Sequence, residues 1–235
     1  MKHIIIASTS TVYGGDYLAY ILDDLNTFFN QANEILFIPY ARPGGMSHDA
    51  YTEKARVAFT KINKSVKGIH TFENPTIAIK KAQAIFVGGG NTFVLLNQLC
   101  KNNLLPILKE VVTKGTPYLG TSAGSNICGL SIKTTNDMPI MYPPNFSALG
   151  FVPFNLNPHY IDPEPNSKHM GETRETRIQE FHGFNPQPVI GLREGSWLFV
   201  KGSSIVLKGT LSARVFEQNK TPYEVYPEAE LNTIK

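Results

Sequence analysis

The sequence is poor in the features that mark secreted and membrane proteins. Only two cysteines occur in 235 residues, Cys100 and Cys128, and their spacing is not that of metal ligands. Two cysteines cannot build the disulfide framework of a small secreted domain, so we expect a reducing compartment, the cytoplasm. The apolar run after Met1 is too short for a signal peptide, and no run approaches the ~20 residues of a membrane span. We therefore expect no membrane partner.

Runs of like charge are also absent. The 22 basic and 19 acidic residues are scattered along the chain and give a net charge of +3. Because a nucleic-acid backbone is normally bound by a clustered basic surface, nucleic-acid binding is not expected. With 42% hydrophobic and 17% charged residues, the composition is that of a globular protein. No repeat, linker or break in composition divides the chain, so we expect a single domain over residues 1–235.

Short β-branched runs alternate with stretches of helical periodicity in the first half of the chain. The predicted strands are 3–7, 34–39, 68–72, 83–87 and 116–119, and the predicted helices are 18–29, 48–62, 91–100 and 104–112. This rhythm is typical of βαβ units. It predicts an α/β fold with a mostly parallel sheet flanked by helices.

The second half of the chain differs in its composition and in its predicted elements. Seven prolines between Pro139 and Pro165 exclude a long helix there. Beyond this loop-rich region, residues 171–181 form a charged helix candidate, and short strands are predicted at 151–156, 189–192, 197–201, 204–207 and 214–217. We expect the strands of the C-terminal part to pair in antiparallel fashion.

The strongest local signal is Gly120-Thr121-Ser122-Ala123-Gly124, which follows a predicted strand and precedes a short predicted helix. Such a tight turn lifts a serine hydroxyl above the sheet, as in a nucleophile elbow. The N–H groups of the helix behind it would stabilise a developing oxyanion. Ser122 is therefore the candidate nucleophile, although the same five residues could form a turn without catalytic duty.

The glycine-rich segment 88–90, followed by Asn91, joins a predicted strand to a predicted helix. It lacks the lysine of a phosphate-binding loop and the spacing of a dinucleotide fingerprint. As part of an oxyanion hole it needs only one N–H group, from Gly89 or Gly90, paired with that of Ala123. A simple connection between strand and helix is the alternative.

A serine nucleophile needs an imidazole base, and the imidazole in turn needs an orienting carboxylate. Among six histidines, His159 has the best setting, because it follows a predicted strand on the rigid turn Asn157-Pro158-His159. Two carboxylates could orient it, Asp137 and Glu194, and the residues alone do not choose between them. Either could instead stabilise a turn.

Six blocks together resemble the peptidase E family of α-aspartyl dipeptidases. They are GGGNTF at 88–93, GTSAGSN at 120–126, TTNDMPI at 134–140, NPH at 157–159, GETRETRI at 171–178 and GLREGSW at 191–197. The resemblance implies a three-layer α/β fold like that of class I glutamine amidotransferases. It also implies a serine peptidase that releases aspartate from small Asp-X dipeptides without metal or cofactor, as a monomer or small homo-oligomer.

The resemblance also assigns roles. Ser122 becomes the nucleophile and His159 the base, Gly90 and Ala123 become the oxyanion donors, and both Asp137 and Glu194 stay candidates for the third member. Asn91 is a candidate for substrate binding. Because an arginine fork binds a carboxylate with two hydrogen bonds, Arg174 and Arg177 are candidates for the substrate's Asp side chain. The related cyanophycinases, which act on aspartyl polymers, and a catalytically silent binding module on the same fold are the alternatives.

Overall fold

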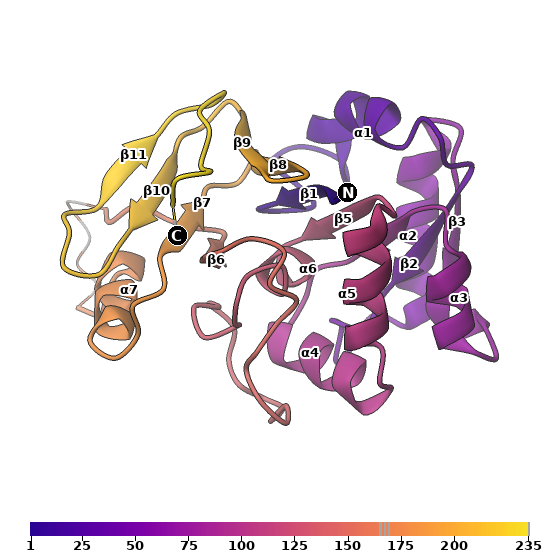
Figure 1. The fold of residues 1–235 in the computed structure, drawn as a ribbon, viewed down its shortest axis with the longest axis horizontal. Coiled ribbons are helices and arrows are strands. Elements are labelled where there is room, and N and C mark those ends of the chain that lie inside the picture. Colours follow the sequence, from indigo (N-terminus) through magenta and orange to yellow (C-terminus); the bar gives the residue numbers. More distant parts are fainter. Residues whose placement is uncertain (165, 167, 169, 235) are drawn as a thin grey trace.

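A seven-stranded sheet forms the centre of the structure, a computed structural model that describes residues 1–234 apart from 165, 167 and 169 (Figure 1). In spatial order its strands are β3 (Ser65–Gly68), β2 (Glu34–Ile38), β4 (Ile85–Val87), β5 (Tyr118–Thr121), β1 (His3–Ala7), β8 (Ser196–Lys201) and β9 (Ser204–Gly209). The first five pair in parallel, and β8 and β9 extend the sheet in antiparallel fashion. The predicted mostly parallel sheet is confirmed.

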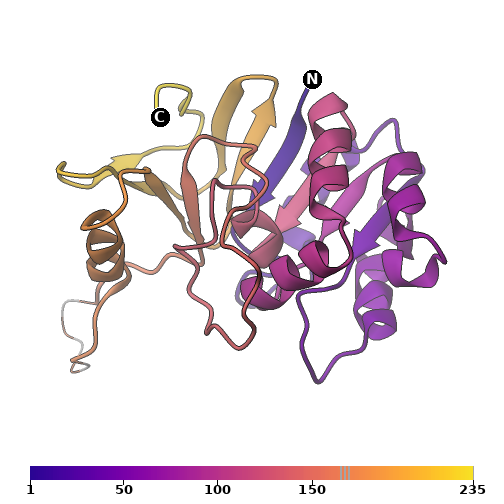
Figure 2. The ribbon, with the colours of Figure 1, turned by 60° about the horizontal axis from the view of Figure 1, so that its bottom comes forward.

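Helices cover both faces of the parallel strands (Figure 2). One face packs against α1 (Leu22–Phe28) and α2 (His48–Thr60), and the other against α3 (Pro75–Lys81), α4 (Thr92–Lys101) and α5 (Leu105–Lys114). Within β1, Ile5 packs on the face covered by α1 and α2, whereas Ile4 and Ile6 pack on the face covered by α3, α4 and α5. Because successive strand residues face opposite sides and both sides are covered, the strand reads as one apolar run. The predicted three layers are confirmed.

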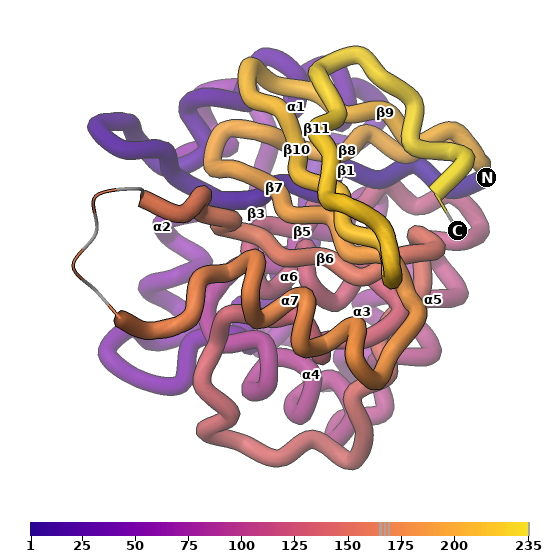
Figure 3. The backbone as a smooth tube through the Cα atoms, turned by 90° about the vertical axis from the view of Figure 1, so that its left-hand side faces the viewer, coloured from indigo at the N-terminus to yellow at the C-terminus, as the bar shows by residue number. Residues whose placement is uncertain are grey.

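A smaller sheet lies beside the larger one. Its order is β11 (Tyr223–Val225), β10 (Ala213–Phe216), β7 (Val189–Leu192) and β6 (Asn155–Pro158), which follow one another from top to bottom in Figure 3. The helix α7 (Arg174–His182) lies beside this smaller sheet. Pairing is antiparallel except between β6 and β7, which are parallel. The turn 193–195 joins β7 to β8 and so links the two sheets.

Several predicted boundaries are wrong. The third strand ends at Gly68, where its pairing with β2 ends, and a 3₁₀ turn, Ile69–Thr71, follows. The strand predicted at 151–156 begins only at Asn155, because Pro153 has no N–H group to donate to a ladder. The predicted elements also lack α3, whose Asn74 cap and following Pro75 are a recognised helix start. In the described part of the chain, no helix is long and apolar enough to cross a membrane.

Candidate active site

Ser122 occupies the sharp turn between β5 and α6 (Ala123–Asn126), so the predicted strand–turn–helix is present. Its backbone angles, φ 53° and ψ −109°, are rarely adopted by residues other than glycine. The glycines beside it allow close packing, since a Cβ on Gly124 would lie 2.2 Å from the Val87 carbonyl oxygen. Such strain persists only where the surroundings hold it, as they do here between β4 and α6.

His159 and Glu194 follow the ends of β6 and β7, two parallel neighbours in which Pro158 pairs with Leu192. The two side chains therefore emerge at the same edge. The Nδ1 atom of His159 lies 2.6 Å from Glu194 Oε1, and its Nε2 atom lies 2.9 Å from Ser122 Oγ. Because a carboxylate can only accept, Nδ1–H donates to Glu194, and Nε2 accepts from the Ser122 hydroxyl. This is the order of contacts in a catalytic triad.

The turn that carries His159 is fixed by Ser8, a buried residue directly after β1. Ser8 Oγ accepts from the His159 N–H at 2.9 Å and donates to the Leu192 carbonyl at 2.7 Å. It thus joins the larger sheet to the two strands of the smaller sheet that precede His159 and Glu194. Ser8 is not among the residues predicted for the site, although its place at the carboxyl end of a strand beside β5 is a usable signal.

Asp137, the other candidate for orienting the imidazole, makes different contacts. Its Oδ2 accepts from the Thr92 N–H at 2.7 Å and from Thr135 Oγ1 at 3.1 Å. The carboxylate hydrogen-bonded to His159 is that of Glu194. Asp137 nevertheless lines, together with Ser122 and His159, a hollow of about 20 Å³. A hollow of that volume holds a group about the size of one water molecule.

The glycine-rich loop lies against the elbow. A Cβ on Gly89 would be 2.9 Å from Ser122 Cβ, and one on Gly90 would be 2.2 Å from the Ala41 carbonyl oxygen. Gly90 also has φ +143°, which favours glycine. Ala123 is the first residue of α6, so its N–H lies ahead of the first hydrogen bond of the helix. Of the two predicted oxyanion donors, Ala123 directly follows Ser122, whereas Gly90 follows Gly89, the residue that contacts Ser122, and itself packs against Ala41.

Asn91 has a structural task. Its Oδ1 caps α4 by accepting from the Val94 N–H at 3.1 Å, and its Nδ2 donates to the Met138 carbonyl at 2.9 Å. It therefore holds the loop that carries Asp137. The structure gives its side chain no place in the lining of the hollow at Ser122.

The two candidate arginines differ in their surroundings. Arg177 is exposed and lies 4.0 Å from Glu172. Arg174, the first residue of α7, is half-buried and has no ion pair within the described ranges. Burial lowers the pKa of Arg174, and Arg177 lowers it further, whereas Asp137 raises it. Arg174 is thus a partly desolvated cation within electrostatic range of Asp137, although neither arginine lines the hollow at Ser122.

An ion-pair network supports the turn next to Glu194. Arg193 donates to both carboxylate oxygens of Asp162, at 2.7 and 2.6 Å, and to both of Glu224, at 2.9 and 3.0 Å. Only 16% of its side chain is exposed. Asp162 follows His159 by three residues, so Arg193 ties the segments of both triad partners to β11.

Replacing Arg193 by methionine is expected to lower the melting temperature at pH 7 by about 5 °C, because Asp162 loses its cation and Glu224 keeps only Arg214, at 3.4 Å. The Arg193 hydrogen bonds lower the pKa of Asp162. A lowered folded-state pKa means that this stabilisation is present above about pH 4 and is lost as the pH falls through the folded value. Calorimetry from pH 7 to pH 3 should therefore show the two proteins converging in acid. The control is Arg56→Met, at an exposed pair with Glu53, which should change the melting temperature by less than about 2 °C. Equal falls in melting temperature for the two variants would contradict this prediction. A difference between Arg193→Met and the wild type that does not change with pH would also contradict it.

Cys128 is unsuited to act as a nucleophile. It is fully buried beneath the elbow, and burial raises its pKa far above that of a free thiol. Because the thiolate is the reactive form, this cysteine is inert at neutral pH.

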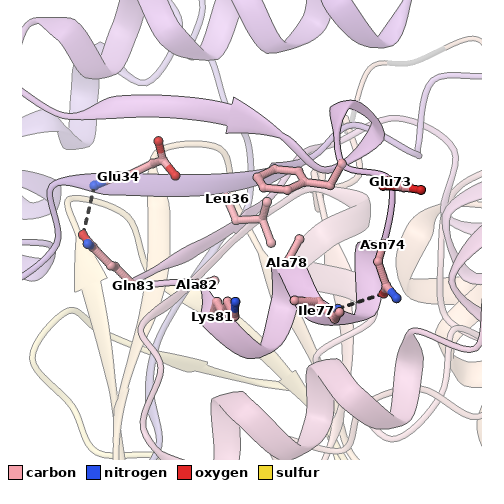
Figure 4. A pocket seen from close by; sticks show the side chains of 10 residues that line it. Glu34, Leu36, Glu73, Asn74, Ile77, Ala78, Lys81, Ala82 and Gln83 are labelled. Carbon is pink, nitrogen blue, oxygen red and sulfur yellow. Dashed lines mark hydrogen bonds between the residues drawn. The ribbon is translucent and has the colours of Figure 1, made fainter.

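Another hollow, of about 420 Å³, lies between α3 and the start of β2 (Figure 4). Its lining includes Glu34, Lys81 and Gln83, at or before the amino ends of β2 and β4. In open α/β sheets, ligands bind at the carboxyl ends of the strands, where Ser122 and the glycine-rich loop lie. Position therefore favours the hollow at Ser122 as the active site.

Comparisons with known proteins find relatives over nearly the whole chain. The profile of peptidase family S51 matches residues 4–208. Peptidase E of Streptomyces coelicolor is 44% identical over 232 residues, covering 99% of this chain and 94% of that protein. The probable alpha-aspartyl dipeptidase of Drosophila melanogaster is 45% identical over 236 residues, covering 99% and 97%.

Solved structures share the fold. A putative peptidase E from Listeria monocytogenes EGD-e superposes with a TM-score of 0.65 at 24% identity, covering 89% of this chain and 98% of that one. A peptidase from an acI-B1 actinobacterium gives a TM-score of 0.72 at 14% identity, covering 98% and 96%.

Proposed function

The chain belongs to peptidase family S51, and from this membership we propose that it is a serine dipeptidase that hydrolyses Asp-X dipeptides. The observation that carries the proposal is the continuous contact from Ser122 Oγ through the His159 ring to Glu194. The names of its relatives support aspartate as the first residue of the substrate.

In the proposed mechanism, Ser122 Oγ attacks the main-chain carbonyl carbon of the substrate's Asp residue while His159 Nε2 takes the hydroxyl proton. Glu194 stabilises the imidazolium that forms. The oxyanion accepts hydrogen bonds from the N–H groups of Ala123 and Gly90. His159 then gives its proton to the leaving amine, and a water molecule, deprotonated by His159, releases aspartate from the acyl-enzyme.

The test of substrate class is the release of leucine from Asp-Leu, Glu-Leu, Asn-Leu and Ala-Leu. We expect kcat/KM for Asp-Leu to exceed that for Asn-Leu by about 100-fold or more, because the neutral amide of Asn cannot pair with a cation of the site. Equal rates for Asp-Leu and Asn-Leu, or no cleavage of any of the four peptides, would contradict the proposal.

We propose Arg174 as the partner of the substrate's side-chain carboxylate, since it is half-buried and lies within electrostatic range of Asp137. Arg174→Ala is expected to lower kcat/KM for Asp-Leu by about 100-fold or more, because a charge-assisted, two-pronged contact is lost. Steady-state kinetics measures this loss. The matched variant Arg177→Ala removes an exposed arginine one turn further along α7 and should change kcat/KM by about twofold at most. The reverse order of the two effects would assign the role to Arg177.

The cytoplasmic location, the single domain and the monomeric or small homo-oligomeric state remain predictions from the sequence. Analytical ultracentrifugation would establish the oligomeric state.

A further inference from the structure

A buried tyrosine lies against the glycine-rich loop. Tyr51, in the first turn of α2, is fully buried, and its hydroxyl donates to the Gly89 carbonyl at 3.1 Å. The tyrosine also packs against Gly88, where a Cβ would lie 2.7 Å from the hydroxyl oxygen. Its ring makes a T-shaped contact with Phe37, and the Arg42 guanidinium lies over the ring, 5.1 Å from its centroid. These contacts hold the Tyr51 hydroxyl in one place beside the loop.

The carbonyl that Tyr51 binds belongs to the same peptide unit as the Gly90 N–H, one of the predicted oxyanion donors. Because this peptide is trans, its C=O and N–H groups point in opposite directions, and a bond to one fixes the direction of the other. Tyr51 lies on the face of the sheet covered by α1 and α2, whereas Gly89 contacts Ser122 on the other side. The Gly90 N–H is thereby directed away from Tyr51, toward the side of the elbow.

The loop leaves this N–H group available to a ligand. The Gly88 N–H donates to the last residue of β2 at 3.2 Å, and the Asn91 N–H donates to the Ala41 carbonyl at 2.7 Å, so the loop is fixed at both ends. Between these bonds, the N–H groups of Gly89 and Gly90 have no acceptor among the residues that the structure describes. A fixed N–H group without an internal acceptor, close to a nucleophile, is what an oxyanion hole requires.

From this arrangement we propose that Tyr51 is a positioning residue of the oxyanion hole. Its bond to the Gly89 carbonyl keeps the peptide unit from rotating and holds the Gly90 N–H toward the oxyanion that forms when Ser122 attacks. Without that bond the unit can rotate, because the glycines on both sides of it allow many backbone angles. Donors that are already aligned stabilise the transition state without reorganisation. The inference rests on the proposed function and extends it to a residue outside the triad.

The variant Tyr51→Phe removes the hydroxyl and keeps the ring. It should lower kcat for Asp-Leu by about 10- to 100-fold and leave KM within about twofold of the wild-type value, because an oxyanion donor acts on the transition state and not on the bound substrate. Steady-state kinetics measures both constants. A rise in KM with kcat unchanged would place Tyr51 in substrate binding, and two unchanged constants would leave it without a role. Either result would overturn the inference.

The matched control is Tyr17→Phe. Tyr17 is a buried neighbour of Tyr51, with 6.4 Å between the ring centroids, and its hydroxyl has no hydrogen-bond partner in the described part of the chain. Its kcat should stay within about twofold of the wild-type value. Equal falls in kcat for the two variants would trace the effect to the packing of these rings, and the inference would be wrong. Melting temperatures establish that both variants are folded under the conditions of the assay.

Crystal structures of the wild-type protein and of Tyr51→Phe separate this inference from the proposed function, because the orientation of a peptide unit does not depend on the substrate. In the variant we expect the Gly90 N–H to be turned away from Ser122 or to occupy two orientations. A peptide unit oriented as in the wild type would overturn the inference even where Asp-Leu is hydrolysed. Failure of the wild-type protein to hydrolyse Asp-Leu would contradict the proposed function and leave this structural comparison intact.

Discussion

Replacing Ser122 by alanine is expected to lower kcat for Asp-Leu hydrolysis by about 10⁴- to 10⁶-fold. The hydroxyl is the only group of this side chain that can bond to the substrate carbonyl, and His159 Nε2 lies 2.9 Å from it. Removing the nucleophile leaves substrate binding and the oxyanion donors in place. A small residual rate above that of the uncatalysed reaction is therefore expected.

Leucine release, followed over hours, measures the residual rate of Ser122→Ala. Its control is Ser125→Ala within the single turn of α6, where the buried hydroxyl donates to the carbonyls of Ala7 and Gly120. That variant should lose stability but retain kcat within about tenfold. Turnover by Ser122→Ala near the wild-type rate would refute the serine mechanism.

Replacing Glu194 by glutamine is expected to lower kcat by about 10²- to 10⁴-fold. The carboxylate accepts from His159 Nδ1–H at 2.6 Å and stabilises the imidazolium during attack. A neutral amide gives less stabilisation, and its NH₂ group favours the wrong tautomer of the ring.

The comparison with Asp137 distinguishes the two carboxylates. Asp137→Asn leaves the hydrogen bond between His159 and Glu194 in place, so its kcat for Asp-Leu should stay at least about tenfold above that of Glu194→Gln. Steady-state kinetics on the two variants measures this difference. A larger loss of kcat in Asp137→Asn than in Glu194→Gln would assign the orienting role to Asp137.

Local sequence was enough to predict the elbow. The residues around Ser122 contain the strand, the turn and the small neighbours within nine positions, and the structure places them as expected. The same holds for the glycine-rich loop, since β4 and β5 are adjacent and both end at the same edge of the sheet. Both features depend on local backbone geometry, which neighbouring residues in the sequence determine.

The choice between Asp137 and Glu194 could not be predicted from the residues. It depends on the parallel register of β6 and β7, whose residues lie more than thirty positions apart in the chain. Strand register across such a distance is set by packing of the whole sheet and leaves little local trace. The role of Ser8 could not be predicted for a similar reason, because it becomes visible only when segments distant in the chain come together.

Transfer of the aspartyl group to Ser122 is the central step of the proposed mechanism, and a diphenyl phosphonate analogue of aspartate tests it most directly. Such esters phosphonylate serines that are activated as nucleophiles. Peptide mapping by mass spectrometry after complete inactivation should place one phosphonate group per chain on the peptide that contains Ser122. Modification of a different residue, or an unmodified protein that still hydrolyses Asp-Leu in an excess of the reagent, would contradict the account.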